Sequence, residues 1–190
     1  MGVAGAMHPG LDIGPIPAGT LRLVPLGAGD AEALRAVTSD PAVTAVIPFL
    51  PEPFGLKQAE ALLDRQQAGR DLYLGIRAGV DEPVPGVTEG TLLGVVGVHL
   101  RGSNDLEIGY WLPGRHHGRG IAGTAVPVAA AAYARAFPDR RLIAECHPAN
   151  FASRRVLARA GFRPAGQPGQ RPGRALHVYA PDGGATAEQG

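Results

Sequence analysis

Apolar residues recur along the chain at two spacings, and each spacing predicts a different kind of element. Alternation of apolar and polar positions over residues 20–25 predicts a strand with its leucines on one face. Apolar residues three and four positions apart predict helices over residues 30–37, which Asp30 can cap, and over residues 56–68. Gly69 is expected to end the second of these helices.

The rest of the chain predicts five more strands and two more helices. The run at 92–100 is almost continuously apolar, which is typical of a strand buried on both faces. Gly161 is expected to end a helix over 150–160, with Phe162 folded back on Leu157. The strands are expected at residues 72–78, 92–100, 106–112, 141–146 and 175–179, and a Gly-rich segment after the third leads into an Ala-rich helix that ends near residue 136.

The resulting order, βααβββαβαβ, predicts an α/β (α+β) fold in which helices flank a mixed, mainly antiparallel sheet. A chain of 190 residues fits one domain, which we place at residues 18–180. Residues 1–17 and 181–190 lack periodicity, so a disordered lead-in and a disordered tail are expected. Residues 41–55 form a proline-broken apolar segment that could border a substrate site.

Composition and charge exclude several classes of function. A formal net charge of +1 argues against a nucleic-acid partner and against an anionic membrane surface. No apolar stretch approaches the ~20 residues that a membrane span needs. The single cysteine, Cys146, has no partner for an intrachain disulfide, and residues 1–10 lack a signal-peptide pattern, so a cytoplasmic location is expected. A homodimer stays open.

The triplet Glu145, Cys146 and His147 raises the question of a metal site. Neighbouring residues on a strand point to opposite faces, and the chain has no second cysteine. We therefore predict no metal.

A Gly-rich segment between an expected strand and an expected helix is the sharpest local signal. It reads Arg115, His116, His117, Gly118, Arg119, Gly120, Ile121 and Ala122. Gly118 and Gly120 let a ligand approach the backbone, and the free N–H groups of the next helical turn favour a diphosphate. Arg115 and Arg119 add forked donors. A tight strand–helix connection would look the same, so the loop alone is weak evidence.

Two further motifs stand at suitable separations from this loop. The first is Leu106-Glu107-Ile108-Gly109-Tyr110-Trp111-Leu112, and the second is Asn150-Phe151-Ala152-Ser153-Arg154-Arg155-Val156-Leu157, which ends at Gly161-Phe162. Together the three resemble the GNAT acetyltransferase superfamily, and more narrowly the branch named for the ribosomal-protein-alanine N-acetyltransferases. The resemblance covers roughly residues 18–180 and includes the Asp40-Pro41 loop.

The resemblance implies a fold detail, a co-substrate and a set of site residues. The strands at 106–112 and 141–146 are expected to splay apart and admit the pantetheine arm of acetyl-CoA, with the diphosphate on the glycine segment. The cofactor-binding residues implied are Tyr110, Trp111, Leu112, Arg115, His117, Gly118, Arg119, Gly120, Ile121, Ala122, Asn150 and Ser153.

This sequence departs from the family pattern at three places. Many members carry, where Leu157 stands, a Tyr that protonates the leaving thiolate; Ser153 is the expected substitute. Branch members often have Glu where Thr124 stands. Pro127 removes a helical hydrogen bond and crowds the carbonyl of residue 123, at a cost of ~3 kcal/mol; Gly123 can relieve the crowding, and we expect a kink there.

An ammonium cannot attack a thioester, so the amine needs a proton acceptor. Glu107 is our first candidate, although a solvent-facing strand end would look the same; Glu145, His147 or a water are the alternatives. The sequence thus predicts an N-acetyltransferase acting on a protein N-terminus or a small-molecule amine by direct attack. Two hypotheses compete with it: an acyl-CoA-binding sensor or scaffold without turnover, and an RNA- or ribosome-associated protein that uses the cluster of arginines late in the chain. Nothing in the sequence identifies the acceptor or the acyl chain preference.

Overall fold

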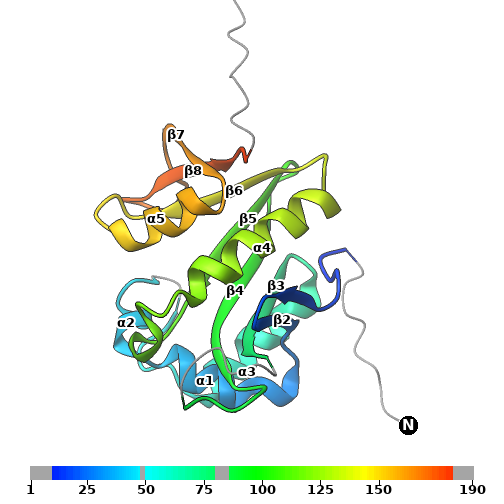
Figure 1. Ribbon diagram of the computed structural model, residues 1–190, viewed down its shortest axis with the longest axis vertical. Coiled ribbons are helices and arrows are strands. Elements are labelled where there is room, and N and C mark those ends of the chain that lie inside the picture. The colour runs from blue at the N-terminus through cyan, green and yellow to red at the C-terminus, as the bar shows by residue number, and fades with distance from the viewer. Residues whose placement is uncertain (1–9, 48–49, 80–85, 182–190) are drawn as a thin grey trace, which may run out of the picture.

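The structure, a computed structural model, describes residues 10–47, 50–79 and 86–181. Within these residues, eight strands form one sheet in the order β1-β2-β3-β4-β5-β6-β8-β7 (Figure 1). The strands are β1 Ile16–Ala18, β2 Leu21–Pro25, β3 Asp71–Ala78, β4 Leu92–Arg101, β5 Asp105–Trp111, β6 Arg141–Cys146, β7 Phe162–Pro168 and β8 Ala175–Tyr179. Of the pairs described, β5–β6 is parallel and the others are antiparallel. The expected mixed, mainly antiparallel sheet is confirmed.

Helices cover both faces of this sheet. They are α1 Ala31–Thr38, α2 Pro41–Thr44, α3 Leu56–Asp64, α4 Ile121–Ala136 and α5 Phe151–Arg159, with 3-10 turns at Ala28–Asp30, Arg65–Ala68 and Gly114–His116. Gly69 and Gly161 have φ of 71° and 90°, which confirms that each follows the end of a helical segment.

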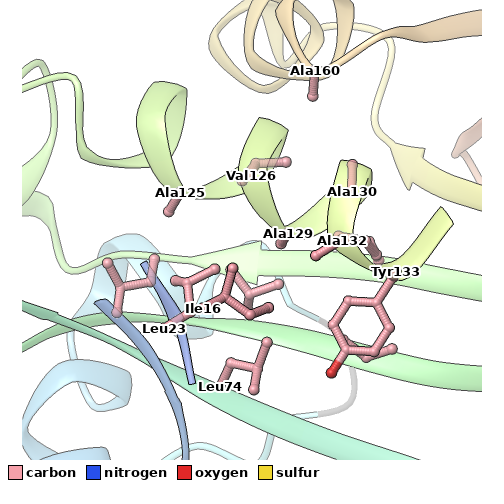
Figure 2. Packing of buried hydrophobic residues seen from close by; sticks show 14 of the residues in the cluster. Ile16, Leu23, Leu74, Ala125, Val126, Ala129, Ala130, Ala132, Tyr133 and Ala160 are labelled. Atoms are coloured by element: carbon pink, nitrogen blue, oxygen red, sulfur yellow. The ribbon is translucent and has the colours of Figure 1, made fainter. Parts of the chain in front are cut away.

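Helix α4 packs on one face of the sheet through its small side chains. Figure 2 shows Ala125 and Ala129 of α4 over the strand residues Leu23 and Leu74. Alanines let a helix approach a sheet closely, so the low aromatic content of the chain does not prevent a dense core.

The opposite face carries α1 and α3. Their inward residues pack on odd-numbered positions of the strands, including Tyr73, Val95 and Trp111. Strand residues alternate between the two faces of the sheet. This face therefore holds the odd-numbered residues of the segments 71–73, 95–101 and 107–111. We call it the α1/α3 face.

The N-terminal part of the chain corrects one expectation. The prediction of disorder over residues 1–17 is wrong for residues 10–17, because β1 pairs with β2 and the buried Leu11 accepts a hydrogen bond from Tyr133 Oη at 2.9 Å through its carbonyl. Residues 1–9 and 182–190 of the predicted lead-in and tail lie outside the described residues.

Two further elements were missed because of their prolines. The segment expected to be a loop after Asp40 begins with α2, where Pro41 opens the helix and Asp40 Oδ1 caps it by accepting from Ala42 N at 2.9 Å. Strand β7 was not expected either; it pairs with β8 at the edge of the sheet, with a shift between Pro164 and Pro168. An edge position tolerates proline, since it leaves the N–H side unpaired.

Strands β5 and β6 separate soon after they meet. Their pairs are Asp105↔Arg141, Leu106↔Leu142 and Glu107↔Ile143, and none follows among the described residues. Beyond this point β6 continues with β8, while β5 continues with β4 (Figure 1). The expected divergence of these strands is confirmed, and we call the opening beyond Glu107 the β5–β6 gap.

Candidate functional site

The β5–β6 gap leaves one edge of β5 without a strand partner. From Ile108 to Trp111, β5 pairs only with β4 among the described strands. Peptide groups on such an edge can pair with an extended ligand, as in strand addition. The gap therefore offers a backbone edge to a linear, amide-containing ligand.

The loop before α4, residues 117–120, which we call the glycine loop, is built for close approach. Gly118 and Gly120 have φ of 73° and 78°, a region that favours glycine. A Cβ at either would meet nothing within 4 Å, and Gly120 caps α4 with no side-chain hydrogen bond. The first-turn N–H groups at Ile121 and Ala122 thus have no side-chain cap, which suits a phosphate.

The charged residues around the glycine loop divide into two groups. Arg115 precedes the loop and Arg119 lies within it; both are exposed and add positive charge. His117 instead places Nε2 2.9 Å from the carbonyl oxygen of Leu112, which ties the loop to the end of β5. His116 is buried, and burial together with Arg115 and Arg119 lowers its pKa, so the ring is held neutral.

Only the main-chain atoms of Trp111 and Leu112 face the β5–β6 gap. Trp111 turns its indole to the α1/α3 face, where Nε1 donates to Thr38 Oγ1 at 3.0 Å. Leu112 is buried in the core beneath α4. The side chains of both are core residues, so a ligand in the gap would contact their main chain.

Tyr110 and Ser153 meet across the gap. Tyr110 Oη on β5 donates to Ser153 Oγ on α5 at 3.1 Å. Burial raises the pKa of Tyr110, which keeps its proton in place. Ser153 N also donates to Asn150 Oδ1 at 3.0 Å, so Asn150 caps α5 and fixes the serine at its first turn. The Ser153 hydroxyl accepts from Tyr110, and it also hydrogen-bonds the buried Cys146, whose pKa burial raises and Ser153 lowers.

Glu107 is neither a solvent-facing strand end nor a free carboxylate. It is 4% exposed, and its oxygens accept from Arg101 Nε at 2.6 Å and from both terminal nitrogens of Arg171 at 2.5 and 2.9 Å. Burial alone would raise the pKa of Glu107, but the two guanidinium groups hold it below its ordinary value. A carboxylate so stabilised is a weak proton acceptor, which disfavours our first candidate for the base.

Glu145, the alternative candidate for the base, is likewise engaged by hydrogen bonds. Its side chain is buried and accepts from the backbone N–H of Gln170 and from Arg171. His147 is exposed, and its Nδ1 accepts from Ala149 N at 3.2 Å. Glu145 therefore holds the turn between β7 and β8.

A polar cluster that the sequence did not suggest lies on the α1/α3 face. His99 Nδ1 on β4 is 2.7 Å from Asp71 Oδ1 on β3, and we call this pair the dyad. Burial alone would raise the pKa of Asp71, but the hydrogen bond and charge of His99, with Arg101 and Arg65, lower it. Asp71 is thus ionised and accepts the Nδ1 proton. The signal available in the sequence was a histidine inside the apolar run at 92–100.

A cavity of about 130 Å³ opens beside the dyad. Its lining residues are Arg65, Asp71, Tyr73, His99, Arg101 and Arg171. Tyr73 is fully buried, and its hydroxyl has no hydrogen-bond partner among the described residues. Burial raises the pKa of Tyr73 to about 12, so the unpartnered group is a neutral hydroxyl. Buried polar groups are usually hydrogen-bonded, so this hydroxyl is suited to bind a polar ligand.

The described residues contain no cluster of three or more His, Cys, Asp or Glu residues arranged for a metal ion. They also contain no helix with the length and apolar character needed to cross a membrane.

Comparisons with known proteins agree with this geometry. A family model described as "Acetyltransferase (GNAT) domain" matches residues 20–163. No curated protein matches by sequence. The matched residues include both sides of the β5–β6 gap and the glycine loop.

Solved structures resemble the fold closely at low identity. One is a ribosomal-protein-S5-alanine acetyltransferase from Vibrio fischeri, at 17% identity and a TM-score of 0.71, covering 90% of this chain and 98% of that one. Another is RimL, a ribosomal L7/L12 alpha-N-protein acetyltransferase in complex with coenzyme A, at 19% identity and 0.71, covering 88% and 99%. A third is RimJ from Mycobacterium smegmatis in complex with CoA-disulfide, at 25% identity and 0.65, covering 90% and 89%.

Proposed function

The chain belongs to the GNAT acetyltransferase family, and we propose that it moves an acetyl group from acetyl-CoA to a primary amine by direct attack within a ternary complex. As a family member it is an acyltransferase that uses a coenzyme A thioester. The observation that carries the proposal is the unpaired edge of β5 beyond Glu107, beside an uncapped helix N-terminus.

The residues present fit acetyl-CoA along this path. The β5 edge at Tyr110, Trp111 and Leu112 would pair with the amides of the pantetheine arm. The glycine loop and the first turn of α4 would take the diphosphate, with Arg115 and Arg119 adding charge. When bound, the co-substrate supplies an acetyl thioester that an amine can attack.

The chain's own groups then act on charge and protons. Backbone N–H groups of the β5 edge are suited to stabilise the oxyanion that forms at the thioester carbonyl. The Ser153 hydroxyl, which accepts from Tyr110, is suited to donate to the departing thiolate. Tyr110 and Ser153 would together take the role of the tyrosine that many family members carry where this chain has Leu157.

We propose an α-amino group, at a protein N-terminus or on a small molecule, as the acceptor. The three structural neighbours described above are named as acetyltransferases of ribosomal proteins or as RimJ and RimL, which supports this class. An α-amine has a pKa near 8, whereas a lysine side chain is near 10, so less work is needed to neutralise it. A cytoplasmic location and a homodimer stay predictions from the sequence.

The test is release of free thiol from acetyl-CoA in the presence of peptides with unblocked N-termini, amino acids, polyamines and aminoglycosides. We expect thiol release that depends on the acceptor, together with a gain of an acetyl mass on its nitrogen. Tight binding of acetyl-CoA in calorimetry with no thiol released for any amine would contradict the proposal and favour the sensor hypothesis.

A further inference from the structure

We propose that His99, oriented by Asp71, is the group that takes the proton from the acceptor amine, and that the amine is bound on the α1/α3 face over Gly109. The inference rests on the proposed function and extends it to the acceptor side of the site. It replaces Glu107, the base that the sequence suggested.

The register of three strands brings the relevant residues together. Asp71, His99 and Glu107 are successive partners across β3, β4 and β5, and Tyr73, Gly97 and Gly109 form the next row. Partners on neighbouring strands present their side chains to the same face. The second row therefore contains two positions without side chains, directly beside His99.

The imidazole of His99 lies over this row. A Cβ added at Gly97 would stand 2.5 Å from His99 Nε2, so Nε2 occupies the space above Gly97. A Cβ added at Gly109 would meet nothing within 4 Å, so the space above the adjacent residue is open. Nε2 thus borders an open site on β5.

The open site lies at the β5–β6 gap. Glu107 makes the last pair with β6, and Gly109 follows it on β5 at the same face. A thioester held along the β5 edge would place its carbonyl carbon near this point. An amine that entered from the α1/α3 face would reach that carbon while its proton faced Nε2.

The hydrogen bonding of His99 makes Nε2 the basic atom. Asp71 accepts the Nδ1 proton, so in the neutral form of the ring the lone pair is on Nε2. No hydrogen bond to Nε2 occurs among the described residues. Glu107, by contrast, has both oxygens engaged by guanidinium groups.

Charged and polar groups surround His99 on several elements. They are Arg65 on the 3-10 turn, Asp71 and Tyr73 on β3, Arg101 on β4, Glu107 on β5 and Arg171 between β7 and β8. Arg101 and Arg171 are paired with Glu107, and the Asp71 carboxylate faces the ring directly. Protonation of His99 therefore creates an imidazolium beside its own counter-ion.

The Tyr73 hydroxyl is an independent sign that a polar guest belongs here. Its ring packs edge-on against His99 with centroids 5.7 Å apart, Tyr73 lines the same cavity, and its buried hydroxyl has no hydrogen-bond partner among the described residues. It is suited to bind a carbonyl or a hydroxyl next to the acceptor's amino group, as a peptide N-terminus presents.

The proton balance is complete. His99 Nε2 takes one proton from the ammonium and later passes it to solvent. The nitrogen lone pair forms the C–N bond, the C–S bond breaks with its electron pair on sulfur, and a second proton from nitrogen replaces the one that the thiolate gains through Ser153. The products are an amide, a free thiol and one proton in solution.

The test compares His99→Asn with the wild type in steady-state kinetics, using a peptide acceptor. The asparagine amide can keep the hydrogen bond to Asp71 while Nε2 is lost, so the fold is expected to survive. We expect kcat near pH 7 to fall by roughly 100- to 1000-fold, with acetyl-CoA affinity unchanged within about twofold. The loss should shrink toward about pH 9.5, where an α-amine is already neutral.

A second pair of variants keeps the outcome decisive. Asp71→Asn should reduce kcat by about tenfold and shift the ascending limb of the pH profile, because it disturbs the tautomer of His99. Glu107→Gln should keep the wild-type pH profile. Three outcomes would each overturn the inference. His99→Asn could keep full activity, or its fall in kcat could be the same at every pH. Alternatively, the ascending limb of the pH profile could disappear in Glu107→Gln. Absence of thiol release by the wild type would overturn the proposed function as well.

Discussion

Tyr110 on β5 and Ser153 on α5 are joined by a hydrogen bond of 3.1 Å across the gap between β5 and β6, with the phenol as donor. The bond connects the strand edge that would hold a thioester to the helix that follows β6. The Ser153 hydroxyl accepts the phenol proton and also hydrogen-bonds the buried Cys146, so a thiolate in the gap would compete with the Cys146 sulfur for the serine proton. The sequence placed both residues near the cofactor but gave no reason to couple them.

This coupling predicts graded effects of two substitutions. Ser153→Ala removes the donor to the thiolate and should lower kcat by about 10- to 100-fold, whereas Tyr110→Phe should lower it less, because the serine remains. Steady-state thiol release measures both. Ser153→Ala keeps the backbone N–H that Asn150 accepts, so α5 should stay capped. Ser103→Ala, at an exposed turn, is the matched control and should behave as the wild type.

The glycine loop gives a prediction on binding. Gly120 has a φ of 78°, so an alanine at this position would be strained by about 1–2 kcal/mol. The Cβ of the alanine would also lie in the path of a phosphate. We expect the Kd for coenzyme A to rise by at least about tenfold in calorimetric titrations. Gly102→Ala, at φ 56° in an exposed turn with nothing within 4 Å, carries similar strain away from the loop. Equal affinity losses in the two variants would show that strain alone is responsible.

The buried ion pair of Glu107 predicts a dependence of stability on pH. The folded pKa of Glu107 lies below its unfolded value, so the stabilisation is present above the unfolded pKa of about 4.3 and is lost as pH falls through the folded pKa. Glu107→Gln should lower the free energy of unfolding at pH 7 by about 2–3 kcal/mol, because Arg101 and Arg171 lose their partner while remaining partly solvated. Urea unfolding at pH 7 and at successively lower pH measures this, and the difference between variant and wild type should narrow as the pH falls through the folded pKa.

The elements that the sequence predicted well are those whose signal is local. Strand β4 is a continuous apolar run, α4 is rich in alanine, and Gly161 ends α5 by its own backbone freedom. Strands β1 and β7 were missed because each contains proline and gains its order from a neighbouring strand. Local pattern cannot report such pairing.

The site shows the same division between local and distant signals. The glycine loop is a contiguous motif, so its glycines and arginines were found together. Glu107 and Arg171 are 64 positions apart, and His99 and Asp71 are 28 apart. Whether a carboxylate is free or paired depends on strand register and on turns elsewhere in the chain. The sequence therefore named Glu107 as a base, whereas the structure pairs it with arginines.

Leu11 gives a prediction in the segment whose order was not expected. Its side chain is 2% exposed within the core beneath α4, and its carbonyl accepts from the buried Tyr133. Leu11→Ala should lower the free energy of unfolding by about 2–4 kcal/mol through lost burial and the space left behind. Denaturant titration measures the change, and the exposed Ile13→Ala is the control. A neutral Leu11→Ala would restore the view of this segment as a disordered lead-in.

Substitutions at Gly97 and Gly109 should distinguish the role of His99 as the base from the binding of the amine over Gly109. At Gly97 an added Cβ would collide with His99 Nε2 at 2.5 Å, so Gly97→Ala should displace the imidazole and lower kcat by at least about tenfold, with little change in the KM of the amine. At Gly109 an added Cβ finds open space, so Gly109→Ala should leave His99 in place and raise the KM of the amine by narrowing its site. Both variants should bind coenzyme A as the wild type does, since its path follows the backbone edge. Steady-state kinetics with the amine as the varied substrate separates the two effects, and identical behaviour of the two variants would contradict the placement of the amine over Gly109.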